Sequence, residues 1–231
     1  MSARVGLIVP SSNTVAEPDF YRRLDGDATV HTARMYLDEV TPEDEAVMLD
    51  EHLPVALRDL ATTRPDVVVF ACTSAGTLRG NAYEHELTAA IGERTQAPGI
   101  SVAAAVRRAI AARGARRVRV LTPYVEALND KICASLEQEG LEVCAIEGMG
   151  IRANTEIGAV EPGHIVDFAC ERLGGAGGEL LFASCTNFRA LEAREQIEHE
   201  LEIPVVTSNQ AALEAVLECL DGRPSSCVRP T

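Results

Sequence analysis

The chain has 231 residues, of which 46% are hydrophobic and 24% are charged, an ordinary composition for a globular protein with a sizeable core. Its net charge of −14 at pH 7 argues against a nucleic-acid partner, because phosphate binding requires a basic face. No apolar run approaches the roughly 18 residues of a membrane span, and no secretory signal opens the chain. We therefore predict a cytoplasmic protein with neither nucleic acid nor membrane as a partner.

In chain order, short apolar runs alternate with longer amphipathic ones. The apolar runs predict strands at Val5–Val9, Val67–Phe70, Val118–Leu121, Leu141–Ile146, Leu180–Phe182 and Pro204–Val206. The amphipathic runs predict helices at Glu43–Thr62, Tyr83–Thr95, Val102–Arg113, Glu126–Glu139, Gly163–Leu173, Ala190–Leu201 and Gln210–Leu220. Strands that are apolar throughout and alternate with helices indicate an α/β fold with parallel sheets covered on both faces.

The glycine-rich stretch Gly174–Gly178 precedes a predicted strand, but it lacks the GxGxxG spacing of a dinucleotide-binding loop. We therefore expect no nucleotide cofactor. The five histidines are scattered through polar contexts without an HxxxH or Cys–His pairing, so we expect no metal site.

The seven cysteines are odd in number and irregular in spacing, and none forms a CxxC motif. That pattern excludes zinc ribbons and thioredoxin-like sites and favours reduced thiols. Most of these cysteines fit a packing role, because cysteine is among the most buried residue types. The packing assignment covers Cys133, Cys144, Cys170 and Cys219, while Cys227 lies in a polar tail and is expected to be exposed.

An internal duplication runs through the chain. The segment VGLIVP, which ends at Pro10, resembles VRVLTP, which ends at Pro123. Likewise VVVFACTS, which contains Cys72, resembles ELLFASCTN, which contains Cys185. In both halves 62 residues separate the proline from the cysteine. We infer one strand–helix–strand–helix unit used twice.

The duplication brings both cysteines to strand ends. In open α/β sheets, ligands bind beyond the carboxyl ends of the strands, so two halves packed face to face place Cys72 and Cys185 on opposite sides of one cleft. The segments that end the first strand of each half, Pro10–Thr14 and Pro123–Tyr124, line the same cleft. Loop hydroxyls and amides there can hold a carboxylate without arginine. The candidate loop residues are Ser11, Asn13, Thr73, Ser74, Tyr124, Thr186 and Asn187.

Both cysteines are expected to be functional, because reactive thiols occupy accessible loop positions of this kind. A thiol must acquire thiolate character to act as a base or a nucleophile. Backbone amides at a helix start lower a thiol pKa, so we expect such donors near both sulfurs. Ser11 and Ser12 could equally cap the following helix.

These motifs resemble the aspartate/glutamate racemase superfamily. Within it, VPSSNT together with Tyr124, Asn154 and the second cysteine resembles the maleate cis–trans isomerases. The resemblance implies two pseudo-symmetric flavodoxin-like domains with mostly parallel four-stranded sheets, and an active site between them. It also implies that the C-terminal helix returns to the first domain, which places domain one at 1–102 plus 208–231 and domain two at 103–207.

The resemblance further implies an isomerase that needs neither cofactor nor metal and forms a homodimer or a larger homo-oligomer. Its substrate is a small dicarboxylate, maleate or a close cis-butenedioate. The thiolate of Cys72 attacks the double bond and gives a succinyl-cysteine intermediate, Cys185 assists proton transfer, and rotation and elimination yield fumarate. Asn13, Tyr124 and Asn154 are implied to bind the carboxylates. The polar loop after Cys72 is more similar to that of the arylmalonate decarboxylases, but those keep only the second cysteine, which argues against simple decarboxylation.

Two alternatives use the same residues. A two-cysteine racemase of amino acids or other 2-substituted acids needs the thiols as acid and base on opposite faces of Cα, without a covalent adduct. A non-catalytic carboxylate-binding module needs neither thiol for affinity. Trapping of a thioether separates isomerase from racemase, and turnover separates both from the binding module.

Overall fold

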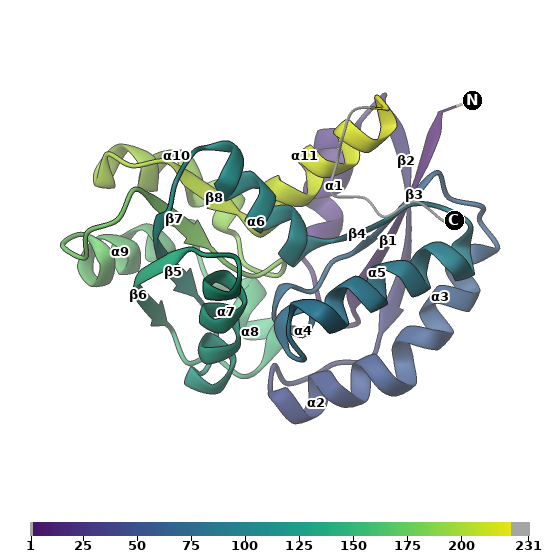
Figure 1. Ribbon diagram of the computed structural model, residues 1–231, viewed down its shortest axis with the longest axis horizontal. Coiled ribbons are helices and arrows are strands. Elements are labelled where there is room, and N and C mark those ends of the chain that lie inside the picture. Colours follow the sequence, from purple (N-terminus) through teal and green to yellow (C-terminus); the bar gives the residue numbers. More distant parts are fainter. Residues whose placement is uncertain (1, 223–231) are drawn as a thin grey trace.

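The computed structural model describes residues 2–222, and this part of the chain forms two four-stranded sheets that lie side by side (Figure 1). The strand order is β2-β1-β3-β4 in the first sheet and β6-β5-β7-β8 in the second. Every pairing within both sheets is parallel. The strands are β1 Ala3–Pro10, β2 Ala28–Met35, β3 Val67–Phe70, β4 Gly99–Ser101, β5 Arg117–Thr122, β6 Glu142–Gly148, β7 Leu180–Ala183 and β8 Val205–Thr207. The predicted α/β class with two matched parallel sheets is confirmed.

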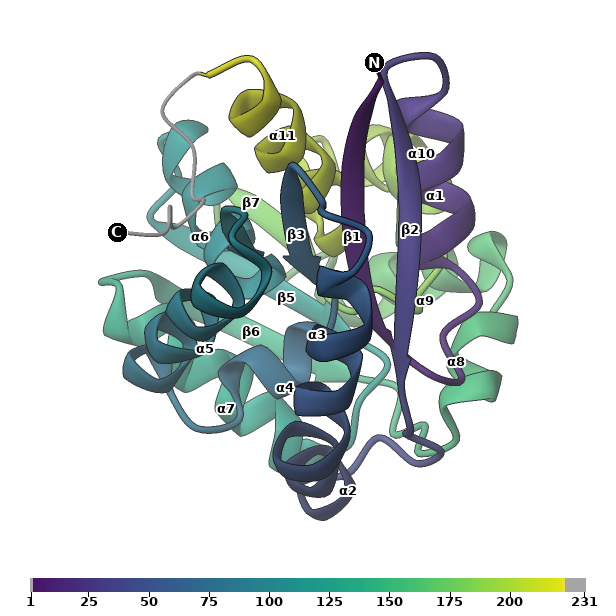
Figure 2. The same ribbon diagram turned by 90° about the vertical axis from the view of Figure 1, so that its right-hand side faces the viewer.

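Helices cover the sheets: α3 contacts β1 and β2, and α5 contacts β3 and β4. In Figure 2, α3 lies in front of the first sheet and α5 lies to its left. On the second sheet, α7 contacts β6, α9 contacts β5 and α10 contacts β8. The helices are α1 Ala16–Leu24, α2 Pro42–Val47, α3 Leu53–Ala61, α4 Thr73–Thr77, α5 Asn81–Thr95, α6 Val102–Ala112, α7 Glu126–Gln138, α8 Asn154–Ala159, α9 Pro162–Leu173, α10 Ala190–Leu201 and α11 Ser208–Leu220, with a π-helical turn η1 at Met48–His52.

Burial explains which strands the sequence pattern finds. The central strands β3 and β7 are buried at every residue, so they read as continuous apolar runs. Strand β2 lies at the edge of its sheet, where it pairs only with β1, and it is only partly buried. Its sequence ATVHTARM is therefore too polar to be recognised as an apolar run. Strand β4 has the sequence GIS, in which Ile100 is the one large apolar residue. These two strands were therefore missed by the sequence pattern.

The predicted helix over 43–62 contains a π-type turn between α2 and α3. The backbone N–H of Leu53 bonds the carbonyl of Met48, five residues earlier. Pro54 follows, and it has no N–H with which to continue the α-helical ladder. The Thr41 side chain caps the start of α2 by accepting from the Asp44 backbone N–H at 3.2 Å. This cap fixes the helix whose Glu45 side chain turns inward.

Helices α6 and α11 pack against each other between the two halves (Figure 1). Helix α11 contacts α1 and β3 of the first half and β8 of the second. The division at 102 and 207 stays a proposal, in which α11 belongs with the first sheet. Residues 223–231 of the predicted first domain, including Cys227, lie outside the described residues.

A connection that follows β2, residues 36–41, joins the first half to the second. The backbone N–H of Val40 bonds the carbonyl of Arg152 at 2.7 Å, and the N–H of Asn154 bonds the carbonyl of Asp38 at 3.0 Å. Glu39 and Ala153 form an isolated antiparallel bridge between these bonds. The 36–41 segment is therefore held by backbone pairing against the start of α8.

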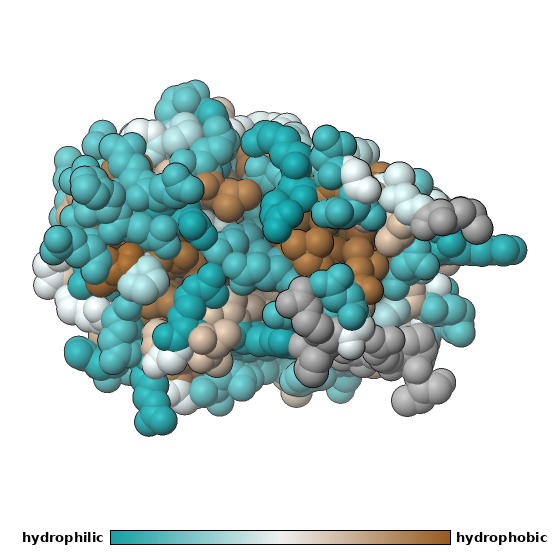
Figure 3. Space-filling model, turned by 90° about the horizontal axis from the view of Figure 1, so that it is seen from above, coloured by the Kyte–Doolittle hydropathy of each residue, from teal (hydrophilic) through white to brown (hydrophobic). Residues whose placement is uncertain are grey.

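The face of the molecule seen from above is mostly hydrophilic, with hydrophobic patches between charged and polar residues (Figure 3). Among residues 2–222, no helix is both long enough and apolar enough to cross a bilayer.

Candidate active site

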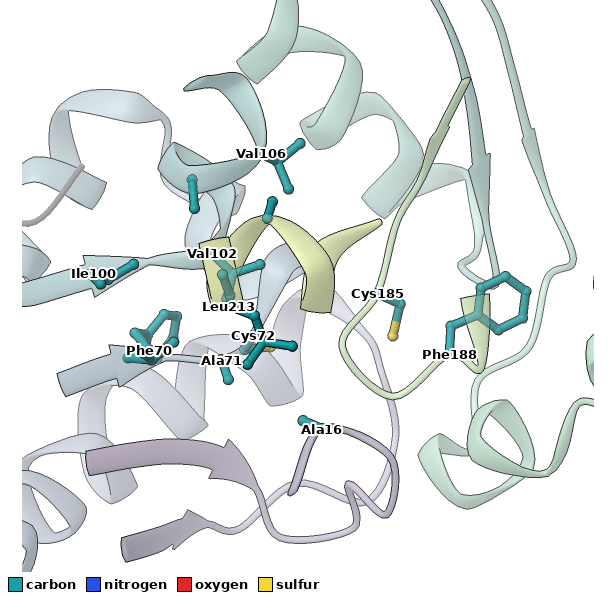
Figure 4. Close-up of a cluster of buried hydrophobic side chains, with 14 of the residues drawn as sticks. Ala16, Phe70, Ala71, Cys72, Ile100, Val102, Val106, Cys185, Phe188 and Leu213 are labelled. Carbon is teal, nitrogen blue, oxygen red and sulfur yellow. The ribbon is translucent and has the colours of Figure 1, made fainter. Parts of the chain in front are cut away.

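The two predicted cysteines follow matching strands, one in each half, and both lie in the interior of the molecule. Cys72 lies two residues beyond the end of β3, and Cys185 lies two residues beyond the end of β7. Figure 4 shows Cys72 beside Ala71 and Leu213, and Cys185 on a separate loop near Phe188. Both side chains are buried. The carboxyl ends of the two sheets therefore converge on one place, as the duplication predicts.

A small cavity lies between the halves, with about 230 Å³ of empty space that includes the solvent at its opening. Its lining comes from both sheets and from the 36–41 segment, and it consists of Pro10, Asn13, Leu37, Val40, Glu45, Cys72, Thr73, Ser74, Tyr124, Asn154, Cys185, Thr186 and Asn187. Neither lysine nor arginine is among these residues. The polar groups facing the cavity are thiols, hydroxyls, amides and one carboxyl.

Nine of the ten residues predicted from the sequence line this cavity, and Ser11 does not. The Ser11 hydroxyl instead accepts the backbone N–H of Leu37 at 3.1 Å. The Ser12 hydroxyl donates to the backbone carbonyl of the same residue, Leu37. Both serines therefore hold the 36–41 segment over the cavity. The catalytic and binding roles of the nine lining residues stay predictions.

Cys72 has an extended backbone conformation immediately before α4. Its sulfur lies 3.8 Å from the Ser74 Oγ and is also hydrogen-bonded by the backbone of Ala75. The pKa of the Cys72 thiol is raised well above its ordinary value, chiefly by burial and then by the charge of Glu45. The thiol therefore needs help to lose its proton near neutral pH.

Cys185 has a different setting. Its φ of 101° is a backbone conformation that residues with side chains rarely adopt. Its backbone N–H donates to the Ser208 Oγ at 3.0 Å, and its sulfur accepts the Asn187 N–H at 3.3 Å. The Tyr124 hydroxyl also bonds the sulfur. Burial still dominates and raises the pKa of the Cys185 thiol to about 12.

The expected amide donors are present at both thiols, but their effect on the pKa is outweighed. Each sulfur accepts a backbone hydrogen bond that lowers its pKa. Removal from water acts in the opposite direction and is the larger contribution at Cys72 and at Cys185. Both thiols are therefore neutral in the closed site, and reaction at either one requires a proton acceptor.

Asparagine and threonine side chains join the two halves around the cavity. The Asn13 amide donates to the Thr186 Oγ at 3.1 Å, and its carbonyl oxygen accepts the backbone N–H of Ala16 at 3.0 Å. Asn187 accepts the N–H of Thr14 at 2.8 Å and donates to the backbone carbonyl of Asn154 at 2.6 Å. These contacts fix the width of the cavity, because each spans residues from opposite halves or orients one that does.

The sequence analysis missed Glu45, Leu37 and Val40. Glu45 is fully buried, and the Ser74 hydroxyl donates to its Oε1. Burial raises the pKa of Glu45 to about 8. A sequence signal for this burial exists, because Glu45 stands three and four residues before the buried Met48 and Leu49 and so shares their helix face.

No group of three or more histidine, cysteine, aspartate or glutamate side chains is placed to hold a metal ion within residues 2–222. The cavity instead offers uncharged donors and two thiols, which suits a small anionic substrate.

Fold and site together define a class: α/β proteins in which two matched parallel sheets each present one cysteine to a shared cavity. Residues 5–227 match the family model described as arylmalonate decarboxylase, and the chain belongs to this family of enzymes. It is 31% identical to a maleate isomerase of Nocardia farcinica over 94% of this chain and 90% of that protein. It is 30% identical to the arylmalonate decarboxylase of Bordetella bronchiseptica over 90% of this chain and 86% of that protein.

A solved structure supports the same assignment. It is a cysteine-to-serine variant of Nocardia farcinica maleate cis–trans isomerase with a covalently bound succinylcysteine intermediate. It superposes with a TM-score of 0.88 at 29% sequence identity and covers 96% of this chain and 94% of that chain. The similarity therefore extends over both sheets and the cavity between them.

Proposed function

We propose that this enzyme isomerises maleate, or a close cis-butenedioate, to the trans isomer through a covalent adduct on Cys72. The observation that carries this proposal is the pair of buried thiols, one from each half, in a single cavity lined mostly by uncharged polar and apolar groups. Relatives named as maleate isomerases, one of them solved with a succinylcysteine intermediate, support it.

The chemistry follows from what rotation requires. A carbon–carbon double bond must lose its π character before its ends can turn, and covalent addition removes that character. The Cys72 thiol gives its proton to an acceptor, which returns it at the end of the reaction, and the sulfur forms a bond to one olefinic carbon. The π electrons move to the neighbouring carbon, which takes the proton of the Cys185 thiol. After rotation the proton returns to Cys185, the double bond re-forms and the Cys72 sulfur leaves. Atoms and electrons balance without an oxidant or reductant.

The carboxylates of such a substrate need preorganised donors, because negative charge builds up on one of them during addition. The cavity offers the hydroxyls of Thr73, Thr186 and Tyr124 and the amides of Asn13 and Asn154. All five side chains are at least nine-tenths buried, so their hydrogen bonds to an anion act in a poorly hydrated site. We assign them to substrate binding.

Further expectations accompany this proposal. We retain the two-domain division at 102 and 207, a homodimeric or larger assembly, and a cytoplasmic location as predictions. Each follows from the sequence or from the resemblance to maleate isomerases.

The test is proton NMR of the reduced protein with maleate in D₂O, beside separate samples with L-aspartate and L-glutamate. Fumarate should appear from maleate, and Cys72→Ser should reduce the rate by at least about 10³-fold, because a hydroxyl is far less nucleophilic than a thiolate. A variant within tenfold of the parent would contradict the nucleophile assignment. Deuterium entering Cα of an amino acid, with maleate unchanged, would make the enzyme a two-cysteine racemase instead.

A further inference from the structure

Glu45 is the one carboxyl group in the cavity lining. It is fully buried on α2, and its Oε2 has no hydrogen-bond partner. No ion pair to Glu45 occurs among residues 2–222. An unpaired buried carboxylate costs free energy, and burial therefore raises the pKa of Glu45 towards neutral pH. Packing alone gives no reason for an acid here, since Met48 and Leu49 continue the same buried face.

A chain of hydrogen-bonding groups leads from Glu45 to the proposed nucleophile. The Ser74 hydroxyl donates to Glu45 Oε1, and the same hydroxyl lies 3.8 Å from the Cys72 sulfur. One hydroxyl therefore touches both the carboxyl and the thiol. A hydroxyl can accept a proton on one side while it donates on the other, so this order of groups can pass a proton.

We propose that Glu45 is the general base for Cys72 and that it acts through the Ser74 hydroxyl. The inference rests on the proposed nucleophilic role of Cys72. The thiol proton passes to the Ser74 oxygen, the Ser74 proton passes to Glu45 Oε1, and the sulfur electron pair forms the bond to the olefinic carbon. On elimination the same protons return. The transfer converts carboxylate and thiol into carboxylic acid and thiolate, so the buried charge is moved and not increased.

The ionisation of Glu45 suits this task. Its pKa of about 8 lies near neutral pH, where a general base is most effective. The titratable side chains around the cavity are those of Cys72, Cys185 and Tyr124, and burial raises the pKa of all three. On the helical elements beside Glu45, the charged side chains are exposed or half-exposed: Glu43, Asp44, Asp50 paired with Arg79, Glu51 and His52.

The test measures alkylation of Cys72 by iodoacetamide, followed peptide by peptide with mass spectrometry so that other cysteines do not interfere. At pH 8, Glu45→Gln should slow the alkylation of Cys72 at least tenfold, since the amide cannot take the proton. A Glu45 that acted only as a nearby negative charge predicts the opposite sign, because its removal would lower the thiol pKa and speed the reaction. Faster or unchanged alkylation therefore overturns the inference, as does a parent whose Cys72 never reacts between pH 6 and 10.

Ser74→Ala separates a relay from a structural role. It should slow Cys72 alkylation as much as Glu45→Gln does, and the double variant should be no slower than either single variant. If the two substitutions slow the alkylation of Cys72 additively in the double variant, the relay is overturned. Glu43→Gln is the matched control, because Glu43 is exposed on the same helix, and it should leave the rate unchanged.

Maleate turnover is recorded in parallel and keeps the two proposals distinct. A parent that does not convert maleate, but whose Cys72 alkylation depends on Glu45 and Ser74, refutes the proposed substrate and supports the base. A parent that converts maleate equally well with Glu45→Gln supports the proposed function and overturns the base. If Glu45 is the base, the alkylation rate of Cys72 in the parent rises with pH, with a midpoint near pH 8. In Glu45→Gln this rise moves to higher pH.

Discussion

The two halves have the same strand order and the same cysteine at the end of the third strand, yet the two thiols have different neighbours. In the first half the fourth residue of α2 is the buried Glu45, which meets Ser74. In the second half the fourth residue of α8 is the buried Ile157, and Asn187 stands in the place of Ser74. Duplication thus explains why two thiols share the cavity. The later differences explain how the thiols can take different roles.

The largest effect expected from a change in the second half is that of Cys185→Ser. Loss of a proton donor in the reaction should lower maleate turnover by roughly 10²–10⁴-fold, while Cys72 keeps its capacity to add to the double bond. Intact mass spectrometry of the variant after incubation with maleate should show the mass of one maleic acid, located on the Cys72 peptide. An adduct on another cysteine, or wild-type turnover, would make the two thiols interchangeable and remove the asymmetry.

The buried acid of the first half should make stability depend on pH. Folding raises the pKa of Glu45 from 4.5 to about 8, so between these values the folded protein keeps a proton that the unfolded chain has lost. The contribution of Glu45 to stability is complete below pH 4.5 and falls by about 1.4 kcal/mol per pH unit up to pH 8. The stability of the Glu45→Gln variant relative to the parent should therefore increase as the pH rises from 4.5 to 8. Urea unfolding at pH 5 and pH 7.5, with Glu43→Gln as the control, measures the difference.

The contacts between the halves give a third comparison. Asn187 accepts a hydrogen bond from Thr14 of the first half and donates one to Asn154 of its own half, whereas the matched Ser74 bonds Glu45 within the first half. Asn187→Ala leaves the N–H of Thr14 without its partner and should cost about 1–3 kcal/mol. Urea unfolding measures this loss, and an unchanged midpoint would mean that the halves do not depend on this contact.

The smallest effect is expected at the surface. Arg152 and Glu39 form an ion pair across the halves at 2.9 Å, but both side chains are largely exposed. Arg152→Ala should lower stability by less than about 1 kcal/mol, and the difference should shrink further in high salt. A larger loss in the same urea measurement would show that the surface pair, and not only the buried amides, holds the halves together.

Much of this molecule could be predicted from its sequence because its duplication is still visible. Central strands such as β3 and β7 are apolar throughout, and equal spacing places Cys72 and Cys185 at matching strand ends. The edge strand β2 was missed because half of its surroundings are solvent or loop, so its side chains need not be apolar. Parallel α/β patterns therefore predict the centre of a sheet better than its edges.

The cavity was predicted less completely than the fold, and for a different reason. The strand-end residues follow from topology, which is why Thr73 and Thr186 could be named in advance. Glu45 comes from a helix, where an acid flanked by Glu43 and Asp44 is expected to be solvated. The spacing of Glu45 to the buried Met48 and Leu49 is a local signal of its burial, but the path by which the 36–41 segment leads into α2 has no such signal. The raised thiol pKa values were also missed, since they depend on the degree of closure.

The pairing of the 36–41 segment with the start of α8 affects which side product the enzyme can avoid. Leu37 and Val40 cover one side of the cavity, and the bridge between Glu39 and Ala153 holds that cover in place. Exclusion of bulk water from a site suppresses side reactions of bound intermediates. Under the proposed function the competing reaction is hydration, in which water adds to the double bond in place of sulfur and leaves a hydroxy acid. The cover therefore keeps the proposed reaction to a single product. If the cover is loosened, a hydroxylated by-product should form beside fumarate.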